Sequence, residues 1–230
     1  MSKINTVVFD FDGTVADTNQ LIIDSWHAVY RAYYGKDGDE DYILSTFGEP
    51  LFYSMAKAFP DHDVDETVAI YRGYQKDVFR DRIKLFPGVL ELIRGLKEKG
   101  YKVGIATSRL KDPTFEGIEV LGLSPYIDEV VTVEDTEKHK PEPEPALACL
   151  EKLKSLPEES IMVGDSAFDM GCGKNAGMET VLVSWSQAQT SSHDSVAKNE
   201  VASDNQNVFI PDYIIDSAEE LWEILEGNSC

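Results

Sequence analysis

The chain has 230 residues, 42% of them hydrophobic, and its 21 Lys and Arg against 42 Asp and Glu give a formal net charge of −21. This length suffices for one large domain or for a core with a smaller second domain. An isoelectric point near 4.4 argues against nucleic acid and anionic membranes as main partners, because both require a basic surface. An anionic substrate would need a divalent cation and a few placed basic residues to reverse the local field.

The first residues and the cysteines indicate a compartment. Met1 to Asn5 lacks the pattern of a signal peptide, and no apolar run is long enough to cross a bilayer. Cys149, Cys172 and Cys230 form no paired framework and no Cys-x-x-Cys. We therefore expect a cytoplasmic protein with free thiols.

Short apolar runs alternate with helical patterns along most of the chain. This alternation predicts an α/β fold, a doubly wound parallel sheet with helices on both faces. In such sheets, ligands bind beyond the carboxyl ends of the strands. The expected strands are residues 4–9, 101–106, 129–133, 161–164 and 180–183, and the expected helices are residues 89–99, 113–121, 143–154 and 167–176.

Residues 16–84 interrupt the alternation, because they contain no convincing strand and their apolar residues follow helical spacing. We expect a small helical domain over residues 16–84, inserted into a core domain made of residues 1–15 and 85–230. Its aromatic residues are expected to form its own core. Further along, Ser186–Asn207 is expected to be a long polar loop, and Asp216–Leu225 a final helix capped by Asp216 or Ser217.

The first apolar run, Val7-Val8-Phe9, leads into Asp10-Phe11-Asp12-Gly13-Thr14. The apolar residues are typical of a buried parallel strand. Carboxylates close to a core are costly unless they are paired or bound to a metal. Gly13 would let the chain turn sharply and let a ligand approach the backbone. The sequence therefore predicts a metal and phosphate site at this strand end.

Three further strand ends carry polar residues. Thr107-Ser108 could bind a phosphate oxygen, although a simple helix cap explains these two residues equally well. Lys140 stands in His139-Lys140-Pro141, where a proline restricts its reach, although a lone Lys is by default an ordinary surface residue. Asp165 and Asp169 add two carboxylates to the same sheet edge. Four carboxylates that converge require a cation, and oxygen ligands alone suit Mg²⁺.

The order of these motifs resembles that of a known family. Asp-x-Asp-Gly-Thr, Thr, Lys-Pro and Gly-Asp-x-x-x-Asp follow each other as in the haloacid dehalogenase-like hydrolases, in particular the branch of phosphoglycolate phosphatases and pyrophosphatases. The resemblance spans nearly the whole chain. It implies a Rossmann-like core, a helical cap domain, Mg²⁺ as cofactor and a phosphoaspartate intermediate. The family's dehalogenases lack the second Asp of the first motif, so carbon–halogen chemistry is not expected of this chain.

The resemblance assigns catalytic roles to four residues. Asp10 would attack phosphorus, and Asp12 would protonate the leaving group and then activate water. Thr107 would bind the phosphoryl group. Lys140 would hold Asp10 and stabilise the transferred charge.

The resemblance also assigns metal ligands and phosphate contacts. Asp165 would bind Mg²⁺ together with Asp10 and the carbonyl oxygen of Asp12, with Asp169 either a direct ligand or a support for the ligands. The remaining residues that we assign to substrate or phosphate binding are Gly13, Thr14, Ser108 and Arg109.

Four functions remain open, and a small phosphorylated metabolite is the expected partner of a monomer or weak homodimer. A phosphoglycolate-like phosphomonoester comes first, because Gly48-Glu49-Pro50 resembles a Gly-x-Pro segment in the caps of such phosphatases. Inorganic pyrophosphate follows closely, because residues 17–23 are similar to the cap entry of bacterial pyrophosphatases. A sugar phosphomutase is disfavoured, because Ile22 stands where the family's mutases carry a His. A non-catalytic binding protein would be expected to lack at least one of the motif residues, and none is missing.

Overall fold

The computed structural model describes residues 4–186, 201–202 and 208–227. Its core is a six-stranded sheet in the order β10-β7-β6-β1-β4-β5, and every neighbouring pair is parallel. This confirms the predicted α/β fold class. The strands are β1 (Thr6–Phe9), β4 (Lys102–Ala106), β5 (Glu129–Val131), β6 (Ser160–Gly164), β7 (Glu179–Val183) and β10 (Tyr213–Ile215).

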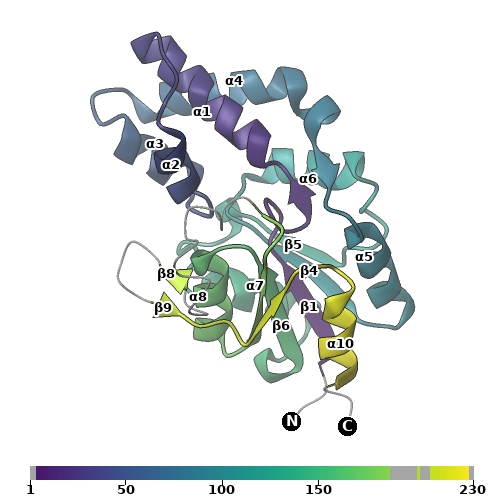
Figure 1. Cartoon of the computed structure of the whole chain (residues 1–230). Helices are drawn as coiled ribbons and strands as arrows, with labels where there is room; N and C mark the ends of the chain where they lie inside the picture. The colour runs from purple at the N-terminus through teal and green to yellow at the C-terminus, as the bar shows by residue number, and fades with distance from the viewer. Residues whose placement is uncertain (1–3, 187–200, 203–207, 228–230) are drawn as a thin grey trace.

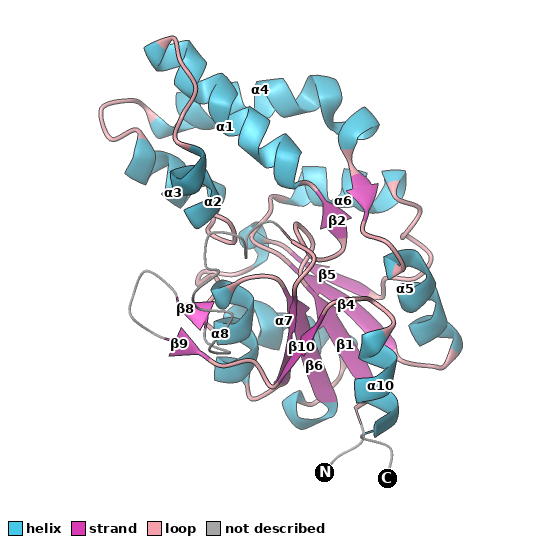
Figure 2. Ribbon diagram, viewed as in Figure 1, coloured by secondary structure: helices cyan, strands magenta, loops and turns pink. Residues whose placement is uncertain are grey.

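Helices cover both faces of this sheet (Figures 1 and 2). Along β1, Val7 and Phe9 pack into the same hydrophobic cluster as residues of α5, α6 and α10, whereas Val8 packs with residues of α7 and α8. This division follows from the period of two in a strand, which sends successive side chains to opposite faces. The helices are α5 (Val89–Glu98), α6 (Lys111–Val120), α7 (Glu144–Leu153), α8 (Ala167–Ala176) and α10 (Glu220–Gly227).

The register of the central strands brings their carboxyl ends to one edge. Phe9 is the partner of Ile105 in β4 and of Val163 in β6. The residues that follow these strands, Asp10, Thr107 and Asp165, therefore emerge side by side. The helical segment lies over this edge of the sheet in Figures 1 and 2.

Four helices lie within residues 19–82 and have a hydrophobic cluster of their own. Trp26 and Phe59 lie at its centre, 2% and 1% exposed, and their ring centroids are 6.1 Å apart. Most of the aromatic residues of this segment thus form a core, as predicted, but Tyr34, Phe52 and Tyr53 are exposed. The helices are α1 (Asn19–Tyr34), α2 (Glu40–Ser45), α3 (Leu51–Ala58) and α4 (Val64–Arg82).

The chain enters and leaves this helical segment through two short strands that the sequence analysis did not predict. β2 (Ala16–Asp17) pairs antiparallel with β3 (Lys84–Leu85). Two-residue strands show no periodicity, so the pattern of apolar residues could not reveal them. The division into domains 16–84 and 1–15 plus 85–230 stays a prediction, and we call residues 16–84 the cap.

The C-terminal part differs from the prediction in two ways. The sequence analysis missed β10, because its residues are few and follow a polar segment. The last helix begins at Glu220 instead of Asp216, and the backbone N–H of Asp216 donates to the Glu220 side chain at 3.1 Å.

The predicted polar loop, residues 186–207, falls largely outside the described residues. Val201–Ala202 forms β8, which pairs with β9 (Val208–Phe209). At the start of the segment Ser186 lies in a bend and is only 3% exposed, a burial that the polar composition did not predict. Among the described cysteines, Cys149 and Cys172 are buried free thiols. No helix in the described part of the chain combines the length and the apolar character needed to cross a membrane.

We predict opposite effects on stability from alanine at two glycines. A Cβ at Gly104 in β4 would lie 2.5 Å from Cys149 Sγ and 2.9 Å from Leu153 Cδ1, so Gly104→Ala should lower the free energy of unfolding by about 1–3 kcal/mol. Gly73 lies within α4 with no atom within 4 Å of such a Cβ, so Gly73→Ala should raise it by about 0.5–1 kcal/mol. Urea titration measures both, and changes of the same sign would contradict this difference in packing.

Candidate active site

An ion pair between Asp10 and Lys140 lies at the carboxyl edge of the sheet. The Asp10 backbone N–H donates to Val163 O at 2.8 Å, which fixes the residue between β1 and β6. Lys140 Nζ lies 2.7 Å from Asp10 Oδ1, and the Lys140 side chain is only 2% exposed. The predicted fixed positive charge is therefore buried beside the predicted nucleophile, although 130 residues separate the two in sequence.

Asp169 holds Lys140 from the other side. Lys140 Nζ donates to Asp169 Oδ1 at 2.5 Å, and Asp169 Oδ2 accepts from Ser166 Oγ at 2.6 Å and from the Ser166 backbone N–H at 3.1 Å. Ser166 and Asp169 form a capping box at the start of α8, so helix formation itself positions the carboxylate. Although burial disfavours the ammonium, Asp10 and Asp169 raise the pKa of Lys140 above its ordinary value.

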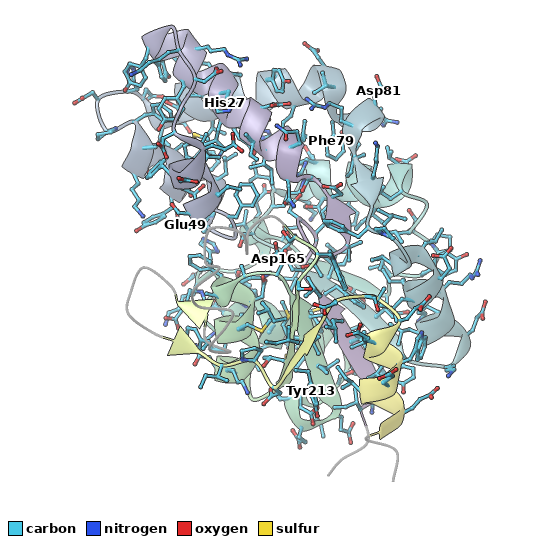
Figure 3. The ribbon with its side chains drawn as sticks, in the orientation of Figure 1. His27, Glu49, Phe79, Asp81, Asp165 and Tyr213 are labelled. Carbon is cyan, nitrogen blue, oxygen red and sulfur yellow. The ribbon has the colours of Figure 1, made fainter. Side chains whose placement is uncertain are left out.

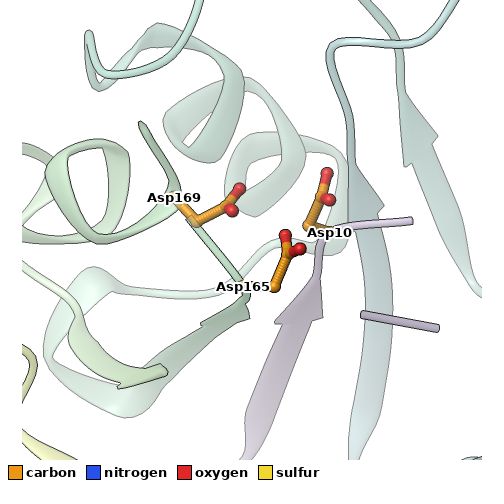
Figure 4. Close-up of side chains that lie close together, drawn as sticks. All are labelled: Asp10, Asp165 and Asp169. Carbon is orange, nitrogen blue, oxygen red and sulfur yellow. The ribbon is translucent and has the colours of Figure 1, made fainter. Parts of the chain in front are cut away.

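Three buried carboxylates converge at this point (Figure 4). Asp10, Asp165 and Asp169 each offer an oxygen within 4.8 Å of the others. Burial raises the pKa of Asp10 to about 7, against the attraction of Lys140, and the Asp169 charge adds to the rise. Burial and the neighbouring Asp169 and Asp10 also raise the pKa of Asp165. One Lys cannot balance three carboxylates, so this all-oxygen donor set fits a hard divalent cation such as Mg²⁺.

Gly13 lets the backbone approach the metal-ligand candidates closely. Its φ is +80°, and a Cβ there would lie 2.1 Å from Asp165 Oδ2 and 2.8 Å from Ser186 Oγ. Thr14 next to it is 1% exposed, and its carbonyl oxygen accepts from Trp185 Nε1 at 3.2 Å. The segment after β7 therefore packs onto the Asp10 loop.

Ser186 and Asn19 belong to the site, although neither was predicted as a site residue from the sequence. Asn19 Nδ2 donates to Ser186 Oγ at 3.3 Å, and both side chains are buried. Ser186 also lies close enough to Asp165 to lower the pKa of that carboxyl, against the rise from burial. The Asn19–Ser186 bond joins positions 167 residues apart, and no motif in the sequence marks Ser186.

Asp12 lies at a different place from the three-carboxylate cluster. Its Oδ1 accepts from Thr18 Oγ1 at 2.6 Å and from Arg109 Nη1 at 3.1 Å. The Asp12 side chain is 22% exposed, and that of Arg109 is 7% exposed. The carboxylate is thus available to a substrate, and a contribution of Asp12 to metal binding through its carbonyl oxygen stays a prediction.

The loop after β4 links the core to the cap. Thr107 is 3% exposed, and its Oγ1 accepts from the Arg109 backbone N–H at 3.2 Å. Ser108 Oγ donates to the carbonyl oxygen of Gly48 in the cap at 2.9 Å, so in this structure its hydroxyl bonds the cap. Thr107 and Ser108 are therefore neighbours in sequence with different contacts.

A cavity of about 110 Å³ lies between cap and core. This is smaller than the roughly 300–1,000 Å³ of pockets for drug-sized ligands, so the cavity suits a small ligand. In Figure 3, Glu49 of the cap and Asp165 of the core lie on opposite sides of this boundary. The lining includes Asp10, Asp12, Asn19, Ile22, Trp26, Glu49, Tyr71, Arg72, Gln75, Thr107, Ser108, Arg109 and Asp165.

Basic residues of the cap differ in their relation to this cavity. Arg72 lines it and is exposed. Lys57 pairs with Glu49, whose side chain is 4% exposed, at 3.5 Å. Arg31 pairs with Asp37, and Arg80 pairs with Glu116 on the surface, away from the lining residues.

The chain is similar in sequence to one family over most of its length. The sequence model described as haloacid dehalogenase-like hydrolase matches residues 7–183. A Bacillus cereus protein named pyrophosphatase PpaX is 34% identical over 225 residues, 98% of this chain and 98% of that protein. A Halalkalibacterium halodurans protein of the same name is 35% identical over 224 residues, 97% of each.

Solved structures show the same fold. A haloacid dehalogenase-like hydrolase from Bacteroides fragilis superimposes with a TM-score of 0.78 at 25% identity, covering 95% of this chain and 100% of that one. A β-phosphoglucomutase from Clostridium difficile also gives a TM-score of 0.78, at 19% identity, covering 98% of this chain and 96% of that one. At the latter identity the likeness shows the fold alone.

We predict a pH dependence of stability that originates at Asp10. Its pKa is higher in the folded state, about 7, than its ordinary value of 3.8, so the protonated form stabilises the fold at low pH and this contribution is lost as pH rises toward and through 7. In chelator, the free energy of unfolding of the wild type minus that of Asp10→Asn should therefore fall between pH 5 and pH 8. Mg²⁺ should restore stability at pH 8, by about 2.7 kcal/mol at one hundred times its Kd, and much less at pH 5.

The matched control is Asp81→Asn, which removes the same charge from an exposed position on α4 (Figure 3). Its free energy of unfolding should change with pH in parallel with that of the wild type, both in chelator and in Mg²⁺. If the free energy of unfolding of Asp10→Asn also followed that of the wild type across this pH range, Asp10 would not titrate as the buried cluster requires.

Proposed function

The chain belongs to the haloacid dehalogenase-like hydrolase family, and from this premise we propose that it is a Mg²⁺-dependent phosphohydrolase that forms a phosphoaspartate on Asp10. The observation that carries the proposal is the buried Asp10–Lys140 pair within a cluster of three carboxylates. A carboxylate nucleophile divides a difficult hydrolysis into two easier displacements. A fixed ammonium beside it supplies the charge stabilisation on which phosphoryl transfer mainly depends.

The first displacement joins Asp10 to phosphorus. An oxygen of Asp10 attacks, the bond from phosphorus to the leaving oxygen breaks, and Asp12 gives its proton to that oxygen. In the second displacement Asp12 takes a proton from water, whose oxygen attacks the phosphoaspartate and releases phosphate and free Asp10. The separate location of Asp12, bonded to Thr18 and Arg109, supports this division of roles between the two carboxylates.

Mg²⁺ would neutralise the phosphoryl oxygens and hold them in line with the nucleophile. Asp10 and Asp165 are the residues that would hold it, with the Asp12 carbonyl oxygen. Both oxygens of Asp169 already accept bonds, from Lys140 and from Ser166, so we assign Asp169 to the positioning of Lys140. Thr107, buried at the end of β4, would donate its hydroxyl to a phosphoryl oxygen, and Gly13 and Thr14 would offer their backbone beside it.

Inorganic pyrophosphate is the substrate that we place first, ahead of the phosphoglycolate-like ester that the sequence analysis favoured. The relatives named pyrophosphatase are similar over nearly the whole chain, which supports this order. The small cavity suits either molecule. A phosphoglycolate-like substrate remains the second candidate, because Gly48 and Glu49 of the Gly48-Glu49-Pro50 segment line the cavity.

A sugar phosphomutase is less well supported. Ile22 lines the cavity at the position where the family's mutases carry a His. An isoleucine side chain can neither donate nor accept the proton that a sugar hydroxyl must exchange.

We expect Mg²⁺-dependent phosphate release from pyrophosphate or phosphoglycolate, and none from Asp10→Asn. The amide cannot form the acyl phosphate, so the loss should be complete within detection while the circular dichroism spectrum stays native. A panel of pyrophosphate, phosphoglycolate and a sugar phosphate, with Mg²⁺ or chelator, measures this. Turnover that survives in Asp10→Asn, or that is equal in chelator, would overturn the proposal.

Asp12→Asn should separate the two displacements. General acid–base catalysis contributes about 10²- to 10⁴-fold, so kcat for pyrophosphate should fall by that amount. p-Nitrophenyl phosphate needs no proton for its leaving group, so phosphorylation of Asp10 should persist with it. The phosphoenzyme should then accumulate and appear in the intact mass, and its absence would contradict the role of Asp12 in the second step.

A further inference from the structure

The Arg109 side chain lies where core and cap meet. Arg109 follows β4 and lines the cavity, and its Nη1 is 3.1 Å from Asp12 Oδ1. Its Cζ lies 4.9 Å from the ring centroid of Phe79, which belongs to cap helix α4 (Figure 3). The guanidinium is thus held between the predicted acid–base residue and an aromatic face of the cap.

Two donors of this guanidinium lack an acceptor. Arg109 Nε and Nη2 are both buried, and neither has a hydrogen-bond partner among the described residues. A buried donor of a charged group without an acceptor is costly, so the arrangement favours a ligand that supplies one. Nε and Nη2 form the side-on edge of the guanidinium, which binds a carboxylate or a phosphate through two parallel hydrogen bonds.

The other charges around the cavity already have a role or a solvated location. Lys140 is bonded to Asp10 and Asp169, so it serves the phosphoryl group that is transferred. Glu49 accepts from Ser54 Oγ at 2.6 Å and pairs with Lys57 at 3.5 Å. Arg72 is exposed. Arg109 is the buried cation beside Asp12, and Asp12 is the residue that would protonate the leaving oxygen.

We propose that Arg109 selects substrates whose leaving group carries its own anionic group, a phosphate or a carboxylate, next to the departing oxygen. Pyrophosphate and phosphoglycolate belong to this class, and phosphate esters of neutral alcohols do not. The inference rests on the proposed function, because it assumes that Asp12 faces the leaving group. It explains how a protein with a net charge of −21 admits a substrate with two anionic ends.

The alternative is that Arg109 only positions Asp12. A positioning role would affect every leaving group of equal basicity alike, whereas recognition of an anion would affect only charged leaving groups. A pair of substrates of similar size and shape, of which only one has a charged leaving group, therefore distinguishes the two.

The experiment compares phosphoglycolate with its uncharged amide in the wild type and in Arg109→Gln. A charge-assisted bidentate pair predicts that the wild type prefers the carboxylate by about 10- to 100-fold in kcat/KM. Arg109→Gln should abolish most of this preference, while the matched control Arg94→Gln, an exposed position on α5, should keep it. The inference would be overturned if Arg109→Gln lowered kcat/KM equally for both substrates, or if the wild type did not prefer phosphoglycolate to its amide.

Binding provides a readout that does not depend on turnover. With Mg²⁺ present, calorimetry of methylenediphosphonate should show about tenfold or greater weakening in Arg109→Gln, and orthophosphate should bind within about threefold of the wild type. Arg109→Lys keeps the charge and loses the paired N–H donors of the guanidinium. If Arg109→Gln fails to fold, Arg109→Lys takes its place, and its affinity for methylenediphosphonate should be weaker than that of the wild type by less than tenfold. A wild type that hydrolyses no phosphate compound but retains this binding difference would refute the proposed function and leave only the anion-binding site at Arg109 standing. Unchanged diphosphonate binding would refute the inference itself.

Discussion

The buried pair of Lys140 with Asp10 is the interaction on which the rest of the site depends. A parallel sheet brings the carboxyl ends of several strands to one edge. Three of the side chains that meet at this edge are carboxylates. Without Lys140 they would repel each other in a poorly solvated place, and the pKa of Asp10 is raised to about 7 even with Lys140 present. The three buried carboxylates therefore leave an excess of negative charge at this edge, which a divalent cation would balance.

The helical segment over this edge gives the site its second half. Ser108 reaches the Gly48 carbonyl oxygen, Thr18 reaches Asp12, and Phe79 covers Arg109, so residues of core and cap share the cavity wall. The two cations lie at different places in the site, Lys140 beside Asp10 and Arg109 beside Asp12. The core thus carries the carboxylates and Lys140, and the cap contributes part of the cavity wall beside them.

The failures of sequence-based prediction have a common physical cause. β2, β3 and β10 have two or three residues each, too few for any periodicity, and they exist because a neighbouring strand supplies hydrogen bonds. Ser186 was assigned to a polar loop, yet it is buried against Asn19. Burial of a polar residue depends on a partner elsewhere in the chain, which local composition does not contain.

The sequence by itself determined the alternating fold, the helical insertion and the motifs that contain Asp10, Asp12, Thr107, Lys140, Asp165 and Asp169, because strand and helix periods and motifs are read directly along the chain. The expected place of Lys140 at a strand end was wrong, because β5 ends at Val131 and Lys140 lies in the loop that follows. Only the tertiary structure decided what these residues touch. It brought Lys140 between Asp10 and Asp169, directed the Ser108 hydroxyl to the cap, and left the side-on edge of Arg109 without an acceptor among the described residues. Those contacts join residues far apart in sequence, and distances of that kind are set by how the layers pack.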